Sequence, residues 1–245
     1  MDLGRGAVAD RAVGLDRLDA QVAGHVDEDA PTHDAALRDR LDAAKQLLAG
    51  GAAMLVVGLA LALVTAIGRM STSALPRGLA RAYISVIRGT PLLVQLFLIF
   101  YALPEIGVDL PPFVAAVIAL SLNVGGYAAE IIRSAIESIP RGQWEAAQTI
   151  GMSRTTALRR IILPQAARTA IPPLSNTLIS LLKDTSLTSI ILVVEIVQTA
   201  KFAAAPSFQY LAMFTLAAVY YWIICLVLSF LQDRAETRLG RFVAA

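Results

Sequence analysis

Three long apolar stretches of this sequence are each able to cross a lipid bilayer as a helix. They cover residues 47–67, 113–132 and 210–231, and the only charged side chain among them is that of Glu130. A helical crossing takes about 20 apolar residues, because lipid offers no hydrogen-bond partner to backbone N–H and C=O groups. The sequence therefore predicts an all-α membrane protein.

Two further stretches predict spans of less regular structure. Residues 171–197 are long enough but contain Lys183 and Asp184 near their middle. Residues 91–103 are short unless the helix extends back across Arg88, whose long side chain can reach the headgroups from the end of a span. The composition is 56% hydrophobic and 16% charged, with a mean hydropathy of +0.63, well above that of a soluble domain. We therefore expect five membrane spans.

The distribution of Lys and Arg predicts the orientation, because short cytoplasmic connections hold the excess of positive charge. The second and fourth connections contain only Lys201. This pattern predicts an N-terminus outside and a C-terminus in the cytoplasm. The other cations flank the first and third connections or follow the last span: Arg69, Arg77, Arg81, Arg88, Arg133, Arg141, Arg154, Arg159, Arg160, Arg168, Arg234, Arg238 and Arg241.

Residues 1–46 differ in kind from residues 47–245. They contain ten Asp/Glu against six Lys/Arg, no aromatic residue and no apolar run that resembles the core of a signal peptide. Apolar residues recur at helical spacing over residues 32–48, which predicts a short helix leading into the first span, with disorder before it. We expect an acidic, hydrophilic tail followed by a transmembrane domain.

Several functional classes lack their sequence signals. The single cysteine, Cys225, lies in the last span, and His25 and His33 lack the companions that a metal site needs. There is no phosphate-binding loop, nucleophile elbow or zinc motif. We expect no catalytic residue, no bound cofactor, no metal and no nucleic-acid partner for this chain.

The segment at residues 140–165 is basic and half-polar, although it lies between two apolar spans. After Pro140, the pattern predicts two helical turns, a left-handed turn at Gly151, and a second helix that is capped by Ser153 and closed by Pro164. Leu158, Ile161 and Ile162 share one face of that helix, whereas Arg154, Arg159 and Arg160 share the other. An interfacial helix that only anchors a loop would show the same periodicity.

The order of residues in this segment resembles the EAA loop of ABC-importer permeases. Glu145, Ala146 and Ala147 are followed after three residues by Gly151, then after nine by Ile161, and then by Leu163 and Pro164. The stretches YISVIRGTPLLVQLFLIFYAL, SLNVGGYAAEIIR and PPLSNTLISLLKDTSL resemble spans of the polar amino-acid family of these permeases. Within that family, GQWEAAQTIGM and LPQAAR are most similar to L-cystine permeases. The likeness covers about residues 47–240.

The resemblance implies a type I ABC importer permease in the bacterial inner membrane. Its loop at residues 140–165 would be a coupling helix that docks on a separate ATP-binding subunit, which would bind ATP and magnesium. The resemblance also implies a periplasmic solute-binding protein and a second permease chain, identical or closely related. The residues expected to couple to the ATPase are Glu145, Ala146, Ala147, Gly151, Ile161, Leu163 and Pro164.

Polar residues inside the spans are candidates for the substrate path, because burying them in lipid is costly. Lys183 and Asp184 are adjacent, so they do not face each other on a helix; they could instead meet the carboxylate and ammonium groups of an amino acid, or brace neighbouring helices. Gly125 and Gly126 could serve helix packing, and Glu130 could pair with Arg133. The expected path residues are Gln95, Asn123, Tyr127, Lys183, Asp184, Thr185 and Ser186.

Three alternatives to a cystine permease stay open at this point. The same architecture could take up another amino acid, because the matching motifs concern fold and coupling more than selectivity. An ion-coupled secondary carrier could use Lys183 and Asp184 as a proton relay, although no inverted repeat is visible. A non-transporting membrane anchor could use the basic loop to recruit a cytosolic protein.

Overall fold

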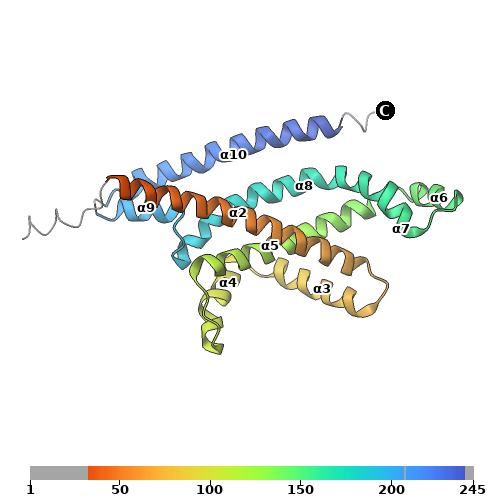
Figure 1. The fold of residues 1–245 in the computed structure, drawn as a ribbon, viewed down its shortest axis with the longest axis horizontal. Coiled ribbons are helices and arrows are strands. Elements are labelled where there is room, and N and C mark those ends of the chain that lie inside the picture. Colours follow the sequence, from red (N-terminus) through yellow and green to blue (C-terminus); the bar gives the residue numbers. More distant parts are fainter. Residues whose placement is uncertain (1–32, 207, 241–245) are drawn as a thin grey trace, which may run out of the picture. The chain divides into compact units, whose positions relative to one another are not determined.

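The computed structural model describes residues 33–206 and 208–240, in which every regular element is helical (Figure 1). The chain divides into two compact units, Met1–Gln46 and Leu47–Ala245. Helix α2 (His33–Met70) begins in the first unit, in agreement with the helix predicted for residues 32–48. The disorder predicted before that helix lies outside the described residues.

Three helices of the described chain are long and apolar enough to cross a membrane unaided. They are α2 through its segment Ala53–Met70, α5 (Pro112–Glu137), and α10 (Tyr210–Gly240) through its segment Tyr210–Thr237. These helices contain the three long apolar stretches of the sequence. Two bent pairs of helices would raise the number of spans to five if each pair is a single broken span.

The first bent pair corresponds to the predicted second span. Helix α3 (Ala74–Gly89) does extend back across Arg88, but it meets the following helical segment, Leu92–Ile106, at 106°. Thr90 is extended, with φ of −119° and ψ of 143°, because a residue before proline avoids the helical region. Residues 74–106 therefore do not form one straight helix. The second segment consists of α4 (Leu92–Phe97), a π-helical turn (Leu98–Ala102) and a 3-10 turn (Leu103–Ile106).

The second bent pair corresponds to the predicted fourth span. Helix α8 (Leu163–Asp184) passes into a 3-10 helix (Thr185–Ile191), and after a bend of 46° helix α9 (Ile196–Ala204) follows. Leu192, in the connection, has a left-handed φ of 64°. Lys183 and Asp184 therefore lie where the α-helix ends, and not in the middle of a regular span as the sequence suggested.

Helix α5 packs against α3, α4 and α8, and α10 packs against α8 and α9. The core around α5 is built largely from small side chains, with Ala115, Ala116, Ala119 and Ala128 fully buried. Small residues let helices approach closely, which matters where lipid removes the hydrophobic driving force between helices. This core holds α5 in place next to the polar residues considered below.

Candidate translocation path and coupling loop

The loop between α5 and α8 begins with α6 (Arg141–Thr149), which ends in a left-handed turn at Gly151. The Gly151 N–H donates to the Gln148 carbonyl at 2.9 Å, and the Met152 N–H donates to the Ala147 carbonyl at 3.0 Å. This is the Schellman arrangement, which satisfies carbonyl groups at the end of a helix. With φ at 75°, position 151 favours glycine, and the predicted left-handed turn is confirmed.

The second half of the loop begins as predicted. The Ser153 hydroxyl accepts a hydrogen bond from the Thr156 N–H at 3.2 Å and so caps α7 (Arg154–Ala157). Ile162 is fully buried and packs with residues at the end of α5 and the start of α8, whereas Arg159 and Arg160 are exposed. The apolar face of the loop thus fixes it to the helices, and its basic face remains accessible.

The side chains of the EAA motif divide between these two environments. Glu145 and Ala146 are exposed on α6, whereas Ala147 is fully buried. Ile161 is partly buried, and Leu163 and Pro164 are exposed. The motif therefore combines residues that shape the turn and its packing with residues that a docking partner could reach.

The prediction that Pro164 closes the second helix is wrong. A π-helical turn, Leu158–Ile162, follows α7, and the Leu163 N–H bonds to the Leu158 carbonyl across this wider turn. Helix α8 then continues directly through Pro164, which occupies its first turn. Proline is tolerated there because its missing N–H falls where the hydrogen-bond pattern is already shifted.

A cavity of about 470 Å³ lies beside the start of α4, between α5 and α8. It brings together three of the predicted path residues, Asn123 and Tyr127 from α5 and Asp184 from the end of α8. Among the described residues, the Asp184 carboxylate forms no hydrogen bond or ion pair within the chain, so it is available to a ligand. The other lining residues are Thr90, Pro91, Leu92, Val124, Asn176, Thr177, Ser180 and Leu181.

Gln95 does not line this cavity, although the sequence suggested that it would. Its side chain is buried, and its amide nitrogen donates to the Ile87 carbonyl at 2.8 Å and to the Thr90 carbonyl at 3.1 Å. Its amide oxygen accepts from Asn123 Nδ2 at 3.4 Å. Gln95 therefore stabilises the sharp bend between α3 and α4 and connects that bend to α5.

Lys183, Thr185 and Ser186 are also absent from the lining of this cavity. Lys183 is exposed. The Thr185 hydroxyl donates to the Leu182 carbonyl and the Ser186 hydroxyl to the Lys183 carbonyl, both at 2.7 Å. These two hydroxyl groups satisfy backbone carbonyls where α8 becomes a 3-10 helix.

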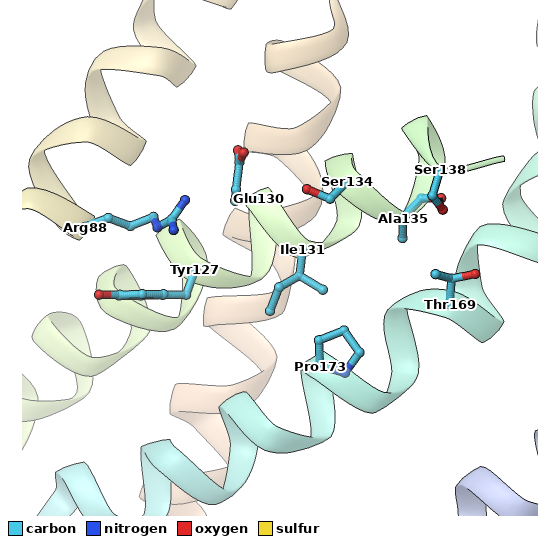
Figure 2. Close-up of a pocket in the computed structure, with 9 residues that line it drawn as sticks. All are labelled: Arg88, Tyr127, Glu130, Ile131, Ser134, Ala135, Ser138, Thr169 and Pro173. Carbon is cyan, nitrogen blue, oxygen red and sulfur yellow. Dashed lines mark hydrogen bonds between the residues drawn. The ribbon is translucent and has the colours of Figure 1, made fainter.

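A second cavity, of about 360 Å³, lies further along α5 toward the coupling loop (Figure 2). Tyr127 lines both cavities. The Arg88 guanidinium lies over the Tyr127 ring, 5.4 Å from its centroid, within the distance of a cation–π contact. The remaining lining residues are Glu130, Ile131, Ser134 and Ala135 from α5, Ser138 just after the end of α5, and Thr169 and Pro173 from α8.

Glu130 forms the structural pair that its spacing suggested. Arg133 Nε donates to Glu130 Oε2 at 3.1 Å, and the same guanidinium also binds Glu137. Both members of the Glu130–Arg133 pair are partly buried, which favours retention of the pair over an isolated charge.

Glu195 is a buried acidic residue that the sequence analysis did not single out. Only 3% of its surface is exposed. Its carboxylate accepts the N–H groups of Val197 and Gln198 at 2.8 and 2.7 Å, and the Tyr221 hydroxyl donates to it at 2.9 Å. Glu195 thus caps α9 and connects it to α10. A lone acid in the run ILVVEIVQTA was the signal that could have identified it.

The chain matches the family of binding-protein-dependent transport system inner membrane components over residues 55–241. The chain belongs to this family. It is 56% identical over 190 residues to the L-cystine transport system permease protein TcyB of Bacillus subtilis, covering 77% of this chain and 81% of TcyB. It is 41% identical over 184 residues to the glutamine transport system permease protein GlnP of Escherichia coli, covering 74% of this chain and 84% of GlnP.

Among solved structures, an amino acid ABC transporter crystallised with histidines matches with a TM-score of 0.75 at 36% identity, over 78% of this chain and 89% of that one. This chain is thus a multi-pass inner-membrane permease of the type I fold, and ATP hydrolysis belongs to a separate subunit. The family works with an ATP-binding subunit, a solute-binding protein and a second permease. Membership displaces the alternatives of an ion-coupled carrier and a non-transporting anchor.

Proposed function

We propose that this chain forms the membrane path of an ABC importer for polar amino acids, with L-cystine as the first candidate substrate. The observation that carries the proposal is the cavity that contains Asp184. A carboxylate without a partner in the chain can bind the ammonium group of an amino acid, and the nearby amides of Asn123 and Asn176 can bind its carboxylate. Lys183, Thr185 and Ser186 stay candidates only for a neighbouring part of the path.

Support for cystine comes from the high identity to TcyB, whose name assigns it to L-cystine transport. GlnP, which is named for glutamine, is the basis of the alternative that another amino acid is carried. Glutamine and cystine share the zwitterionic head group, so a site for that group does not choose between them. Selection must therefore depend on the remaining side chains of the path and on the solute-binding protein.

We further propose that residues 140–165 dock on the ATP-binding subunit. The exposed residues Glu145 and Ala146 offer a contact surface, and the Schellman turn at Gly151 holds α6 at a fixed angle to α7. Because the loop packs on the ends of α5 and α8 through a buried cluster, a displacement of the loop would move these helices as a rigid body.

The test is uptake into proteoliposomes that contain the permease, its ATP-binding subunit and its solute-binding protein. We expect cystine uptake that requires ATP and that exceeds uptake of glutamine and other amino acids. Gly151→Asp should lower uptake and recruitment of the ATPase while the permease remains inserted, because the left-handed φ disfavours a side chain by about 1 kcal/mol and a charge obstructs docking. Normal ATP-driven uptake in Gly151→Asp would contradict the docking assignment, and uptake without ATP would contradict the importer.

We also propose five spans, an outer N-terminus and a cytoplasmic C-terminus, with residues 47–245 as the permease domain and 1–46 as a separate tail. The two bent helix pairs are compatible with five spans, and the charge distribution supports the orientation. In a variant without Cys225, a cysteine at Ser153 should react with an impermeant maleimide only from the cytoplasm, and one at Gly107 only from outside. Reversed labelling at either position would overturn this orientation.

A further inference from the structure

The cavity nearer the coupling loop contains a cation that has no ion-pair partner. Among the described residues the Arg88 guanidinium makes no ion pair, and it lies against the face of the Tyr127 ring. Glu130, which lines the same cavity, is already bound by Arg133. Arg88 is therefore the positively charged group that this cavity offers to a ligand (Figure 2).

The position of Arg88 is fixed by the bend at the end of α3. Gln95 binds the carbonyls of Ile87 and Thr90, the residues that flank Arg88 and Gly89. Gly126 brings α5 close to α3, since a Cβ at this glycine would lie 2.6 Å from Ile87 Cγ2. The backbone of α3 and that of α5 are thus both fixed next to the Arg88–Tyr127 contact. The long side chain of Arg88 can therefore move without a change in the helices.

The two cavities follow one another along α5 and meet at Tyr127. The lining residues on α5 run from Asn123 in the first cavity to Ala135 in the second, a separation of about 18 Å at 1.5 Å per residue. Asp184 supplies an anion to the first cavity, whereas Arg88 supplies a cation to the second. A zwitterion that moves along α5 therefore meets a group that attracts its ammonium end, then the Tyr127 ring, and then a group that attracts its carboxylate end.

We propose that the cavity between α5 and α8 at Arg88 is a second binding site on the substrate path, which receives the substrate's carboxylate at Arg88, with Tyr127 as the partition between the two cavities. A guanidinium binds a carboxylate through two parallel hydrogen bonds, and these are stronger than its contact with an aromatic ring. Arrival of the carboxylate would draw Arg88 away from Tyr127 and free the ring to move. This inference rests on the proposed uptake of amino acids.

The test compares cystine with cystamine, which keeps the disulfide and both ammonium groups but has no carboxylate. Binding of each to the permease–ATPase complex is measured by calorimetry without the solute-binding protein, so that the permease alone selects. The wild-type complex should prefer cystine, and Arg88→Gln should lower cystine affinity about tenfold or more while cystamine binding is unchanged. Arg88→Lys should retain part of the preference. Arg81→Gln is the matched control, because it removes an exposed guanidinium of the same helix that lines neither cavity, and it should leave the preference intact.

Tyr127→Leu separates substrate binding from bracing. If Arg88 only holds Tyr127 in place, Tyr127→Leu and Arg88→Gln will change cystine and cystamine binding equally, which would overturn the proposal.

An anionic lipid headgroup offers the same kind of oxygen anion as a carboxylate. If Arg88 binds such a headgroup, the effect of Arg88→Gln would depend on the fraction of anionic lipid in nanodiscs and would be equal for both ligands. Unchanged preference in Arg88→Gln, with normal ATP-driven cystine uptake, overturns this inference and leaves the transport function standing. If the wild type takes up a different amino acid, the same comparison is made with that amino acid and its decarboxylated amine.

Discussion

Helix α5 packs closely against its neighbours at two glycines and lines cavities with other residues. On one side, Gly125 and Gly126 lie so close to neighbouring helices that an added Cβ would come within 2.6 Å of the Tyr83 hydroxyl oxygen and of Ile87 Cγ2. On the other side, Asn123, Tyr127 and Ser134 line two cavities. One helix thus packs tightly on α2 and α3 at these glycines, and elsewhere on its surface it packs on α8 and lines two cavities with it.

This difference separates stability from transport along a single helix. In lipid, close packing of small residues and interhelical hydrogen bonds hold helices together. The glycine side provides that packing, so we expect the polar groups that line the cavities to contribute less to assembly than the glycines do. We therefore expect substitutions at the packed glycines to reduce the amount of folded permease in the membrane. Substitutions in the cavity lining should instead change the rate of transport or the preferred substrate.

Gly125→Val should have the largest effect, which is loss of folded permease from the membrane. Its side chain would collide with the Tyr83 hydroxyl, with Leu61 Cβ and with the backbone of Gly58, and overpacking of this kind costs about 3 kcal/mol or more. The measurement is the amount of monodisperse permease recovered in detergent, together with its melting temperature. Gly78→Val is the matched control, because no atom of a neighbouring helix lies within 4 Å of a Cβ at Gly78. Equal recovery of the two variants would contradict a packing role for this side of α5.

Asp184→Asn should affect transport more than assembly. The amide keeps the size of the side chain but loses the charge that attracts an ammonium group, so uptake should fall about tenfold or more, or the preferred amino acid should change. Because the carboxylate has no partner among the described residues, the amount of assembled complex should stay near that of the wild type. The measurement is uptake of radiolabelled cystine and other amino acids, normalised to assembled complex.

Asp233→Asn, an equal change of charge at an exposed position of α10, serves as the control for the Asp184 variant. If Asp184 braces neighbouring helices instead, its replacement should deplete the protein from the membrane, since orphaning a buried charged partner costs several kcal/mol. Unchanged rate and unchanged preference in both Asp184→Asn and Lys183→Met would remove these residues from the proposed path.

The sequence predicted the elements that depend on local chemistry. The three long apolar runs became helices, Gly151 adopted a left-handed turn, Ser153 capped α7, and Glu130 paired with Arg133. Each of these depends on residues a few positions apart, whose spacing on a helix or in a turn is known in advance. The EAA motif predicted the ABC-importer permease family, because it fixes the identity and spacing of residues over a whole loop.

The candidate site was only partly predictable, because it depends on contacts between distant segments. Gln95 was expected in the cavity, but the unpaired carbonyls at the α3 bend take its amide. Pro164 was expected to end a helix, but a π-helical turn before it removes the conflict. Glu195 was overlooked because its role depends on Tyr221, which approaches from another helix. Three of the predicted path residues, Asn123, Tyr127 and Asp184, line one cavity in the structure because they belong to the facing helices α5 and α8, and their role in transport stays a prediction.

The smallest expected effect tests the packed side of α5 through a single hydroxyl group. Tyr83 donates to the Leu122 carbonyl at 2.6 Å, so Tyr83→Phe should lower stability by only about 1 kcal/mol. The same hydroxyl is the nearest atom to a Cβ at Gly125, at 2.6 Å, while Leu61 Cβ is 3.0 Å away. Gly125→Ala should therefore be less harmful in a Tyr83→Phe background than in the wild type, with a favourable coupling of about 0.5 to 1 kcal/mol. Melting temperatures of the four proteins in the double-mutant cycle measure this coupling. Strictly additive effects would mean that α2, through Leu61, sets the close approach at Gly125, and that Tyr83 does not.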